Sequence, residues 1–415
     1  MSLVSQVSIN RKIESVFREE SRPALATLLR LLGGNFDLAE DTLQDAFIVA
    51  ATQWPEQGIP DNPRAWLIST ARFKAIDQLR RQQRQQALSE SVLDALVTED
   101  EFATDPEDIE DDQLRLIFTC CHPALSEEAR LALTLREVCG MTTEQIAAAF
   151  LIPVPTLAQR IVRAKNKIQA ANIPYEVPDK VQRAERLNDV LSVIYLIFNE
   201  GYSPSAGQLV VSPALCEEAI RLCRRLGQLA ADYEIKGLLA LMLLHDSRRD
   251  TRIGPDGELV PLEKQNRHLW DQAKIREGCD LVEEALRDAP ASSYAIQAAI
   301  AALHAQAKRP EDTDWKEITG LYTVLWHLQP TVIVALNRAV AIAMRDGPVT
   351  GLGLLANLAD QHQFNKYLPF HAARADLLKR AGQSREAEFA YQQAIELAGE
   401  TPEGAYLQKQ LRTLQ

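Results

Sequence analysis

Long hydrophobic runs are missing from this sequence. No stretch approaches the ~18 consecutive apolar residues that a membrane-spanning helix needs, and the N-terminal segment lacks the apolar core of a secretion signal. We therefore expect a cytoplasmic protein that does not bind a membrane. Alternating runs of β-branched residues are also scarce, whereas alanine and leucine are abundant, which favours a mostly helical chain.

The six cysteines lack the paired spacing of a zinc site or of a disulfide-stapled domain. Two of them, Cys120 and Cys121, are adjacent in the segment TCCHP, which also allows a metal or redox sensor. We favour a reduced, partly buried pair of thiols. The histidines do not form an HExxH pattern, and neither a nucleophile motif nor a glycine-rich phosphate loop is present. We expect no catalytic residue, no metal and no cofactor.

Charge of one sign is missing from two segments of this acidic chain, whose formal net charge is −12. Residues 85–114 contain eleven acidic residues and no lysine or arginine. Such a block of like charge is typical of a linker, which we predict over residues 85–112. Residues 156–168, in contrast, carry four basic residues and no acidic one. A basic helix in an acidic chain indicates local contact with a polyanion, and a solvated helix face is the alternative.

The pattern of residues 142–168 is that of a helix-turn-helix. Thr142 and Gln145 predict a capping box, Pro153 ends the first helix, and Pro155 fits the first turn of the second. Spacings of i, i+4, i+7 and i+11 give the second helix an apolar stripe of Leu157, Ile161, Ala164 and Ile168. A plain helical hairpin with one basic helix is the alternative. The polar residues that we expect to face the DNA major groove are Thr156, Gln159, Arg160, Arg163 and Lys167.

Two amphipathic segments precede the acidic block. The first, residues 37–54, places Leu43 and Phe47 on one face and acidic and amide side chains on another. The second, PRAWLISTARFKAIDQLRR, combines aromatic side chains with cations, which suits unstacked bases because rings stack and cations hold phosphates. Trp66 and Phe73 share a face, and burial of Trp66 in the core is the structural alternative. In this segment we predict DNA contacts from Trp66, Arg72, Lys74, Arg80 and Arg81.

These motifs, in this order and spacing, resemble the bacterial sigma-70 family of RNA polymerase sigma factors, in its extracytoplasmic-function (group IV) class. DLAEDTLQDAF is similar to the helix that binds the polymerase, PRAWLISTARFKAIDQLRR to the segment that opens and reads the minus-ten promoter element, and residues 126–169 to the part that reads the minus-thirty-five element. Many members have Asn where this chain has Phe73. The resemblance implies two partners, promoter DNA and core RNA polymerase, the latter through its β′ clamp helices and β flap. It assigns polymerase contact to Asp41, Gln44, Asp45 and Phe47.

The remainder of the chain, residues 174–415, exceeds what such a sigma factor needs. Helical patterns predict helices over residues 184–200, 213–227, 232–246 and 269–287. Further on, residues 339–358 and 375–397 align with Gly347 on Gly382, a period of 35 that is close to the ~34 of tetratricopeptide repeats. Together with LIFTCCHPALS, FNEGYSPS and the polar segment 246–271, this part resembles the subgroup of these sigma factors with a regulatory, tetratricopeptide-like C-terminal extension.

We therefore predict an all-α protein with two small helical sigma domains, the second a helix-turn-helix, joined by an acidic linker and followed by a tetratricopeptide-like domain. The predicted boundaries are residues 1–84, 85–112, 113–173 and 174–415. The predicted function is promoter-directed initiation by core polymerase, regulated by the extension and by a protein or small molecule bound to it. We also hypothesise that the extension restrains the two DNA-reading domains until polymerase or a ligand releases them.

Two other functions remain open at this point. One is a tetratricopeptide-type interaction scaffold that carries a DNA-binding helix-turn-helix. The other is a fused enzyme, in which Glu200, His245 and Asp246 supply acid–base or metal chemistry. A charged loop held by salt bridges is the structural interpretation of that polar cluster, and it is the one that we favour.

Overall fold

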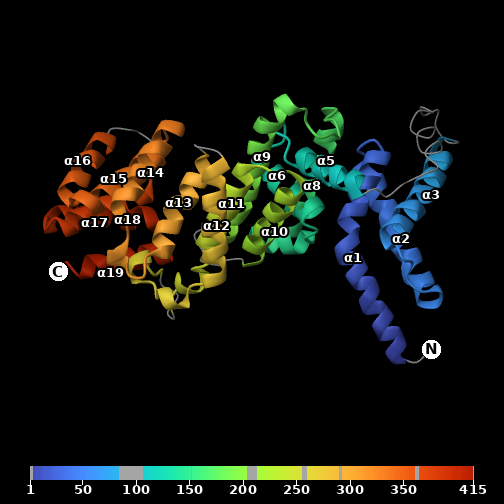
Figure 1. Ribbon diagram of the computed structural model, residues 1–415, viewed down its shortest axis with the longest axis horizontal. Coiled ribbons are helices and arrows are strands. Elements are labelled where there is room, and N and C mark those ends of the chain that lie inside the picture. The colour runs from blue at the N-terminus through green and yellow to red at the C-terminus, as the bar shows by residue number, and fades with distance from the viewer. Residues whose placement is uncertain are drawn as a thin grey trace. The chain divides into compact units, whose positions relative to one another are not determined.

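The computed structural model is built from helices (Figure 1). It describes residues 3–83, 106–150, 152–202, 213–254, 259–288, 292–359 and 364–414. These residues contain no strand, only one antiparallel bridge between Ile253 and Leu259, so the all-α prediction is confirmed. Residues 85–105 of the predicted linker and most of the GPDG turn lie outside the described residues. The chain divides into an N-terminal unit, Met1–Leu196, and a C-terminal unit, Ile197–Gln415.

The N-terminal unit begins with a bundle of three helices, here called the first bundle: α1 (Leu3–Leu31), α2 (Phe36–Gln57) and α3 (Pro63–Gln83). Asn35 caps α2, because its side-chain oxygen accepts a hydrogen bond from the backbone N–H of Leu38. Leucine and alanine side chains fill the core together with Trp54, which is 2% exposed. The segments with predicted polymerase and DNA contacts therefore lie on the neighbouring helices α2 and α3.

In the described residues from Pro106 to Ala170, four α-helices and one π-helical turn form what is here called the second bundle: α5 (Pro106–Cys120), α6 (Glu127–Leu133), η1 (Thr134–Val138), α7 (Thr143–Ala149) and α8 (Val154–Ala170). The structure confirms the predicted capping box of Thr142 and Gln145 and the proline in the first turn of α8. Helix α5 starts at Pro106, inside the segment that we assigned to the acidic linker. The described burial of this helix begins at Asp112, and Leu114 and Leu116 are also buried.

The cysteine pair of the second bundle is buried. Both Cys120 and Cys121 are at most 1% exposed, and all six cysteines are free thiols. Burial raises the pKa of Cys121 to about 11, and its sulfur lies 3.4 Å from the hydroxyl of Thr134. A buried thiol with a raised pKa reacts slowly. This environment favours the packing role over the sensor role.

Helix α9 (Lys180–Tyr202) contributes residues to both units, and the C-terminal unit continues with ten further α-helices in the part of the chain that is described. They are α10 (Pro213–Leu229), α11 (Tyr233–Asp246), α12 (Gln272–Asp288), α13 (Ser293–Gln306), α14 (Trp315–Leu328), α15 (Val332–Asp346), α16 (Pro348–Ala359), α17 (Leu368–Arg380), α18 (Ser384–Ala398) and α19 (Pro402–Arg412). Short 3-10 helices connect some of them: η2 (Arg249–Thr251), η3 (Leu262–Lys264), η4 (Arg267–Leu269) and η5 (Pro310–Asp312). The helix predicted to start at Leu269 starts at Gln272, because Leu269 ends η4.

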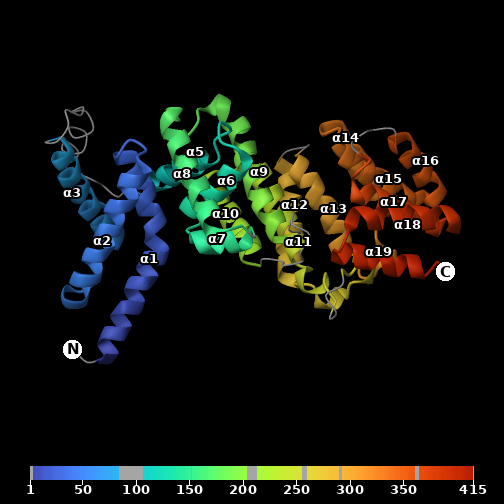
Figure 2. The ribbon, with the colours of Figure 1, turned by 180° about the vertical axis from the view of Figure 1, so that it is seen from behind.

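The two aligned segments near the C-terminus form two helix pairs. Gly347 separates α15 from α16, and Gly382 lies between α17 and α18. Both glycines have positive φ, 101° and 75°, a conformation that other residues rarely adopt. Figures 1 and 2 both show the four helices stacked side by side. Apolar clusters fill the spaces between them, around Leu336 and Phe370 in one case and around Ala387 and Tyr391 in the other.

Taken one at a time, the helices of the described ranges are too short or too polar to cross a membrane. Among helix pairs of these described ranges, only α7 and α8 together satisfy the length and composition of a span, and they are bent by 112°. That bend is within the range of a helix-turn-helix.

Candidate functional site

The predicted DNA-contacting residues of α8 lie on one face of that helix. Arg160 is half-buried and forms an ion pair of 3.3 Å with Glu128 of α6, whereas Arg163 is exposed and donates a hydrogen bond of 3.5 Å to Gln159. All five residues line a single groove of about 420 Å³ between α8 and the start of α6: Thr156, Gln159, Arg160, Arg163 and Lys167. The structure thus brings them together as a surface with guanidinium, ammonium and amide donors.

The opposite face of α8 holds the helix in place. The predicted apolar stripe is confirmed, since Leu157, Ile161, Ala164 and Ile168 are each at most 6% exposed. Lys165 lies beside this stripe, four residues after Ile161, and is also buried. Its ammonium group forms an ion pair with Glu40 of α2. Sequence reasoning had counted Lys165 only as one of the basic residues of a DNA-reading helix.

Glu137 of η1 is the centre of this charged contact between the two bundles. One of its carboxylate oxygens lies 3.1 Å from Nζ of Lys165, an ion pair without hydrogen-bond geometry, and the other accepts a hydrogen bond of 3.3 Å from Arg22 of α1. Burial and the neighbouring Glu40 raise the pKa of Glu137 to about 7, although Lys165 and Arg22 oppose the shift. Burial works against the charge of Lys165, but the carboxylates of Glu137 and Glu40 outweigh it and raise the pKa of that lysine.

A second charged contact joins α1 to α5. Arg30 donates a hydrogen bond of 2.9 Å to Asp112, whose side chain is 1% exposed and also pairs with Arg115. The hydroxyl of Tyr175 donates to the backbone carbonyls of Ala26 at 2.9 Å and of Asp112 at 3.3 Å. We call the six side chains that pair across the two bundles the charged interface: Arg22, Arg30, Glu40, Asp112, Glu137 and Lys165.

The predicted polymerase-contacting residues lie on the outer face of α2. Three of them are exposed: Asp41, Gln44 and Asp45. Ile48 extends the same face at i+7 from Asp41 and is 59% exposed. Phe47 is half-buried against Phe17 of α1, at 4.7 Å between ring centroids, and Phe17 is itself 50% exposed. Ile48 and Phe17 were not among the predicted contacts, although an isoleucine on the acidic face of an amphipathic helix is visible in the sequence.

Helix α3 presents the other set of predicted DNA contacts. Trp66 is half-buried and packs edge-on against Trp54 at 5.3 Å, so its ring is partly a core element. Phe73, which we did not include among the DNA contacts, is 66% exposed. The predicted cations of α3 are half-buried or exposed: Arg72, Lys74, Arg80 and Arg81. An exposed aromatic ring beside cations is the arrangement that stacks on an unpaired base.

The polar cluster of the C-terminal unit is held by internal contacts. The carboxylate of Asp246 is 1% exposed and is neutralised by Arg249 and Lys274 at 2.6 and 2.8 Å. Burial and nearby arginines lower the pKa of His245 to about 3, and its ring packs against that of Tyr202 at 5.5 Å. No group of metal ligands occurs within the described ranges. These contacts favour the structural interpretation of the cluster over acid–base chemistry.

The segment FNEGY is fixed by close packing. A Cβ atom on Gly201 of α9 would lie 2.8 Å from Cβ of Leu215 and 2.9 Å from the backbone nitrogen of Cys216, so only glycine fits there. The ring of Tyr202 stacks on that of Phe198, and the guanidinium of Arg252 lies 3.6 Å from the Tyr202 ring centroid. The segment therefore anchors α9 against α10 and the loop after α11.

Comparison with known proteins agrees with this geometry. Residues 17–85 match the family model of sigma-70 region 2, and residues 115–168 match that of sigma-70 region 4. Residues 186–286 match a family of unknown function, DUF6596. An uncharacterized protein of Rhizobium meliloti (strain 1021) is 46% identical over 397 residues, which cover 94% of this chain and 93% of that protein.

The helical bundles and the two ordered matches define the class: this chain belongs to the sigma-70 family of RNA polymerase sigma factors. More particularly, it is a sigma factor of the extracytoplasmic-function type that carries a C-terminal extension. Sigma factors are in general DNA-binding initiation factors without enzymatic activity. Core RNA polymerase and promoter DNA are the partners that the family implies.

Proposed function

We propose that α2 docks on the β′ clamp helices of the polymerase, that α3 engages the melted minus-ten element, and that α8 reads the minus-thirty-five element. The observation that carries this proposal is the groove of α8, where five predicted DNA contacts face the same way. Arginine and amide side chains on one helix face are the groups that read bases in the major groove. On α2, the acidic side chains and the exposed Ile48 supply a mixed polar and apolar docking face.

Phe73 joins this proposal as a base-stacking residue. Its ring is 66% exposed on α3, beside the exposed Lys74. A ring that gains little from core packing is free to stack, and stacking on an unpaired base is worth about 1–3 kcal/mol. Trp66 is assigned both a DNA contact and a packing role, because part of its ring packs against Trp54.

The charged interface has to open before both promoter elements are read. The two elements are named for positions about 25 base pairs apart, or roughly 85 Å of duplex. Helices α2 and α8 touch through Glu40 and Lys165. Even laid end to end, α2 and α8 span only about 60 Å at ~1.5 Å per residue. Helix α3, which is assigned the minus-ten element, packs alongside α2 at the ~8–10 Å of neighbouring helices, so it stays within about 70 Å of the far end of α8. The contact therefore represents a closed form of the free protein, which binding of polymerase converts into an open one.

The extension, residues 174–415, is assigned the regulatory role in this proposal. Helix pairs with apolar seams, as in α15–α18, support a tetratricopeptide-like array, and such arrays bind partners along one face. The remaining proposed boundaries are residues 1–84, 85–112 and 113–173. A scaffold function without polymerase is the alternative, and the following experiment distinguishes the two.

Run-off transcription with purified core polymerase tests the proposal. We expect specific transcripts from the full chain, and a reduction of tenfold or more in the double variant Arg160→Ala/Arg163→Ala, because each arginine–base contact is worth about 1–3 kcal/mol. Core binding of that variant should be unchanged in a pull-down. Charge reversal at Asp41 and Asp45 should do the opposite, weakening core binding while the isolated protein remains folded. No transcript and no core binding by the wild-type chain would instead favour the scaffold.

A further inference from the structure

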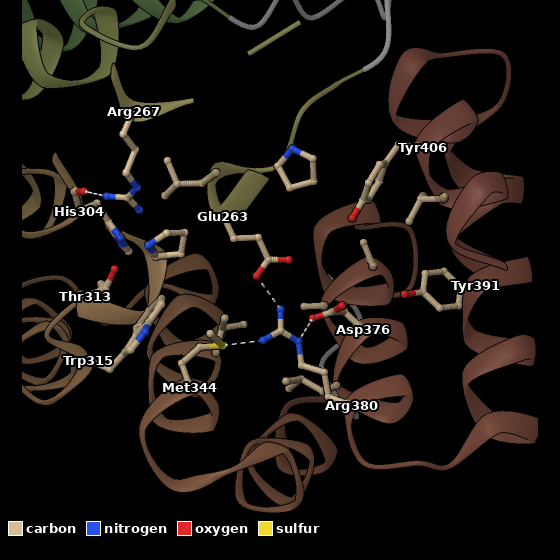
Figure 3. A pocket seen from close by; sticks show the side chains of 18 residues that line it. Glu263, Arg267, His304, Thr313, Trp315, Met344, Asp376, Arg380, Tyr391 and Tyr406 are labelled. Atoms are coloured by element: carbon tan, nitrogen blue, oxygen red, sulfur yellow. Dashed lines mark hydrogen bonds and ion pairs between the residues drawn. The ribbon is translucent and has the colours of Figure 1, made fainter. Parts of the chain in front are cut away.

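The C-terminal unit contains a pocket that none of these functions uses. It has a volume of about 310 Å³ and lies between the loop around η3 and helices of the array, from α13 to α19 (Figure 3). Native interiors are packed so closely that voids larger than a water molecule are few. Small-molecule sites in proteins start at about 300 Å³. The pocket is therefore large enough for a small organic molecule.

Most of the pocket wall is apolar. Trp315, Met344, Leu377 and Leu407 line it, and the Trp315 ring packs edge-on against His304 at 5.3 Å. Burial and two neighbouring arginines hold the pKa of His304 down at about 4, so the imidazole is neutral at pH 7. Such a wall favours a ligand with an apolar body over a strongly hydrated one.

One side of the pocket is closed by a neutralised arginine. Arg380 of α17 donates hydrogen bonds to Asp376 at 2.7 Å, to Glu263 of η3 at 3.1 Å and to the sulfur of Met344 at 3.2 Å. Figure 3 shows these side chains converging on the Arg380 guanidinium. The two carboxylates outweigh the single positive charge of Arg380, so this side of the pocket is net negative and does not attract an anionic ligand.

The other side carries an arginine without a carboxylate partner. Nη1 of Arg267 donates to the backbone carbonyls of His304 at 2.5 Å and of Ala307 at 2.7 Å, and the guanidinium lies over the Trp270 ring. Within the described part of the chain, its Nε is buried without a hydrogen-bond partner, and both hydrogen bonds of the guanidinium come from Nη1. A buried donor without an acceptor costs about 1–3 kcal/mol. The Nε–Nη2 edge is the one that a carboxylate bridges with two parallel hydrogen bonds.

We propose that this pocket binds a small organic carboxylate with an apolar body. The carboxylate accepts two hydrogen bonds from the Nε–Nη2 edge of Arg267, and the body packs against Trp315, Met344 and Leu407. The orientation of the ligand follows from charge, because Asp376 and Glu263 repel an anion at the Arg380 side. The carboxylates nearest Arg267, those of Glu311 and Asp312, form no ion pair with it, and Asp312 is paired with Arg309. This inference concerns the extension alone and does not depend on the proposed promoter contacts.

Binding of matched acids and amides to the full chain tests the proposal. Calorimetry is run with phenylpropionate, indolepropionate and octanoate, each beside its primary amide, which has the same body without the charge. We expect at least one acid to bind roughly tenfold more tightly than its amide, since hydrogen bonds to charged groups are the stronger ones. If each acid binds no more tightly than its amide, or if none binds, the proposal is wrong.

Three variants locate the site. Arg267→Lys keeps the positive charge but loses the planar edge, so the preference for the acid should fall several-fold. Ala373→Met fills the pocket from its wall and should abolish binding of acid and amide alike. Ala273→Met makes the same change at an exposed position at the start of α12 and should bind like the wild type. Full affinity in a folded Ala373→Met variant would place the bound acid elsewhere and overturn the assignment, and the unfolding temperature establishes that each variant is folded.

Discussion

The two units of this sigma factor hold their parts together by different means. In the N-terminal unit, charged side chains bridge the first and second bundles, among them Glu137 with Arg22 and Lys165. In the C-terminal unit, ion pairs such as that of Asp246 with Lys274 also occur, but successive helices share apolar clusters such as the one around Ile318 and Leu325. Separated ions regain water and can pair with another partner, whereas separated apolar seams stay exposed. This difference supports our proposal that the N-terminal unit opens while the C-terminal unit stays folded as one array.

The largest effect is expected from reversing the charge at the centre of the charged interface. Lys165→Glu places a third carboxylate beside Glu40 and Glu137, and loss of a buried partner typically costs about 3–5 kcal/mol. We expect the bundles to separate, with faster hydrogen exchange in residues 22–30 and 134–138. The matched control is Lys167→Glu on the exposed face of the same helix, which should leave exchange unchanged and weaken promoter binding. Wild-type exchange rates in Lys165→Glu would show that the interface does not depend on this charge.

Truncation of a buried side chain in the helical array should lower the free energy of unfolding without separating the two N-terminal bundles. Ile318 is fully buried, so Ile318→Ala should lower the free energy of unfolding by about 2–5 kcal/mol in urea titrations. Ile333 is 49% exposed, and Ile333→Ala should cost less than about 1 kcal/mol. Equal effects of the two substitutions would contradict the assignment of the array core.

The charged interface should also respond to pH. The pKa of Glu137 is raised from 4.5 to about 7 in the folded protein. Between these two pH values, Glu137 is mostly ionised in the unfolded chain and mostly protonated in the folded protein. Rising pH therefore removes stability in this window. Glu40 does not contribute above about pH 5.5, because its lowered pKa leaves it ionised in both states.

Glu137→Gln isolates this response, because glutamine cannot ionise. Relative to the wild type, the variant should gain about 1–3 kcal/mol as pH rises from 5.5 to 8. Taking the difference between the two proteins removes contributions from His122, His245 and His304, whose lowered pKa values act in the opposite direction. A difference that stays constant over this range would mean that Glu137 ionises normally.

The smallest effect is expected at Phe73. Phe73→Ala removes a ring that stacks on at most one base, so promoter opening should weaken by about 1–2 kcal/mol, or roughly tenfold. Stability and core binding should not change, because the ring is exposed. Permanganate footprinting of the melted element measures the effect, and Phe73→Tyr, which keeps the ring, should restore it. Equal melting by Phe73→Ala and the wild type would remove Phe73 from the DNA contacts.

Local features of the fold were predictable because they depend on nearby residues. The capping box of Thr142 and Gln145 and the buried stripe of α8 follow from spacing alone. The paired helices at Gly347 and Gly382 follow from internal alignment. The candidate DNA-contacting face of α8 is the complement of the buried stripe, so it could be listed residue by residue before the structure was known.

The charged interface was not predictable in the same way. Glu137 is 115 residues from Arg22 along the chain, and no local pattern pairs them. The π-helical turn that carries Glu137 has no sequence signature that we recognised. The burial of Lys165 could have been predicted, because its position four residues after Ile161 places it on the buried side of α8. A charged residue on an apolar stripe therefore predicts a buried partner, even when the partner is unknown.

The most direct test of this account is the distance between the two bundles before and after promoter binding. Spin labels on unnatural side chains at the exposed positions Ala51 of α2 and Ala170 of α8 leave all six cysteines unchanged. We predict one short distance in the free protein and an increase of roughly 30 Å or more in the complex with core polymerase and promoter DNA. The short distance, retained in a complex that makes transcript, would contradict the opening of the charged interface.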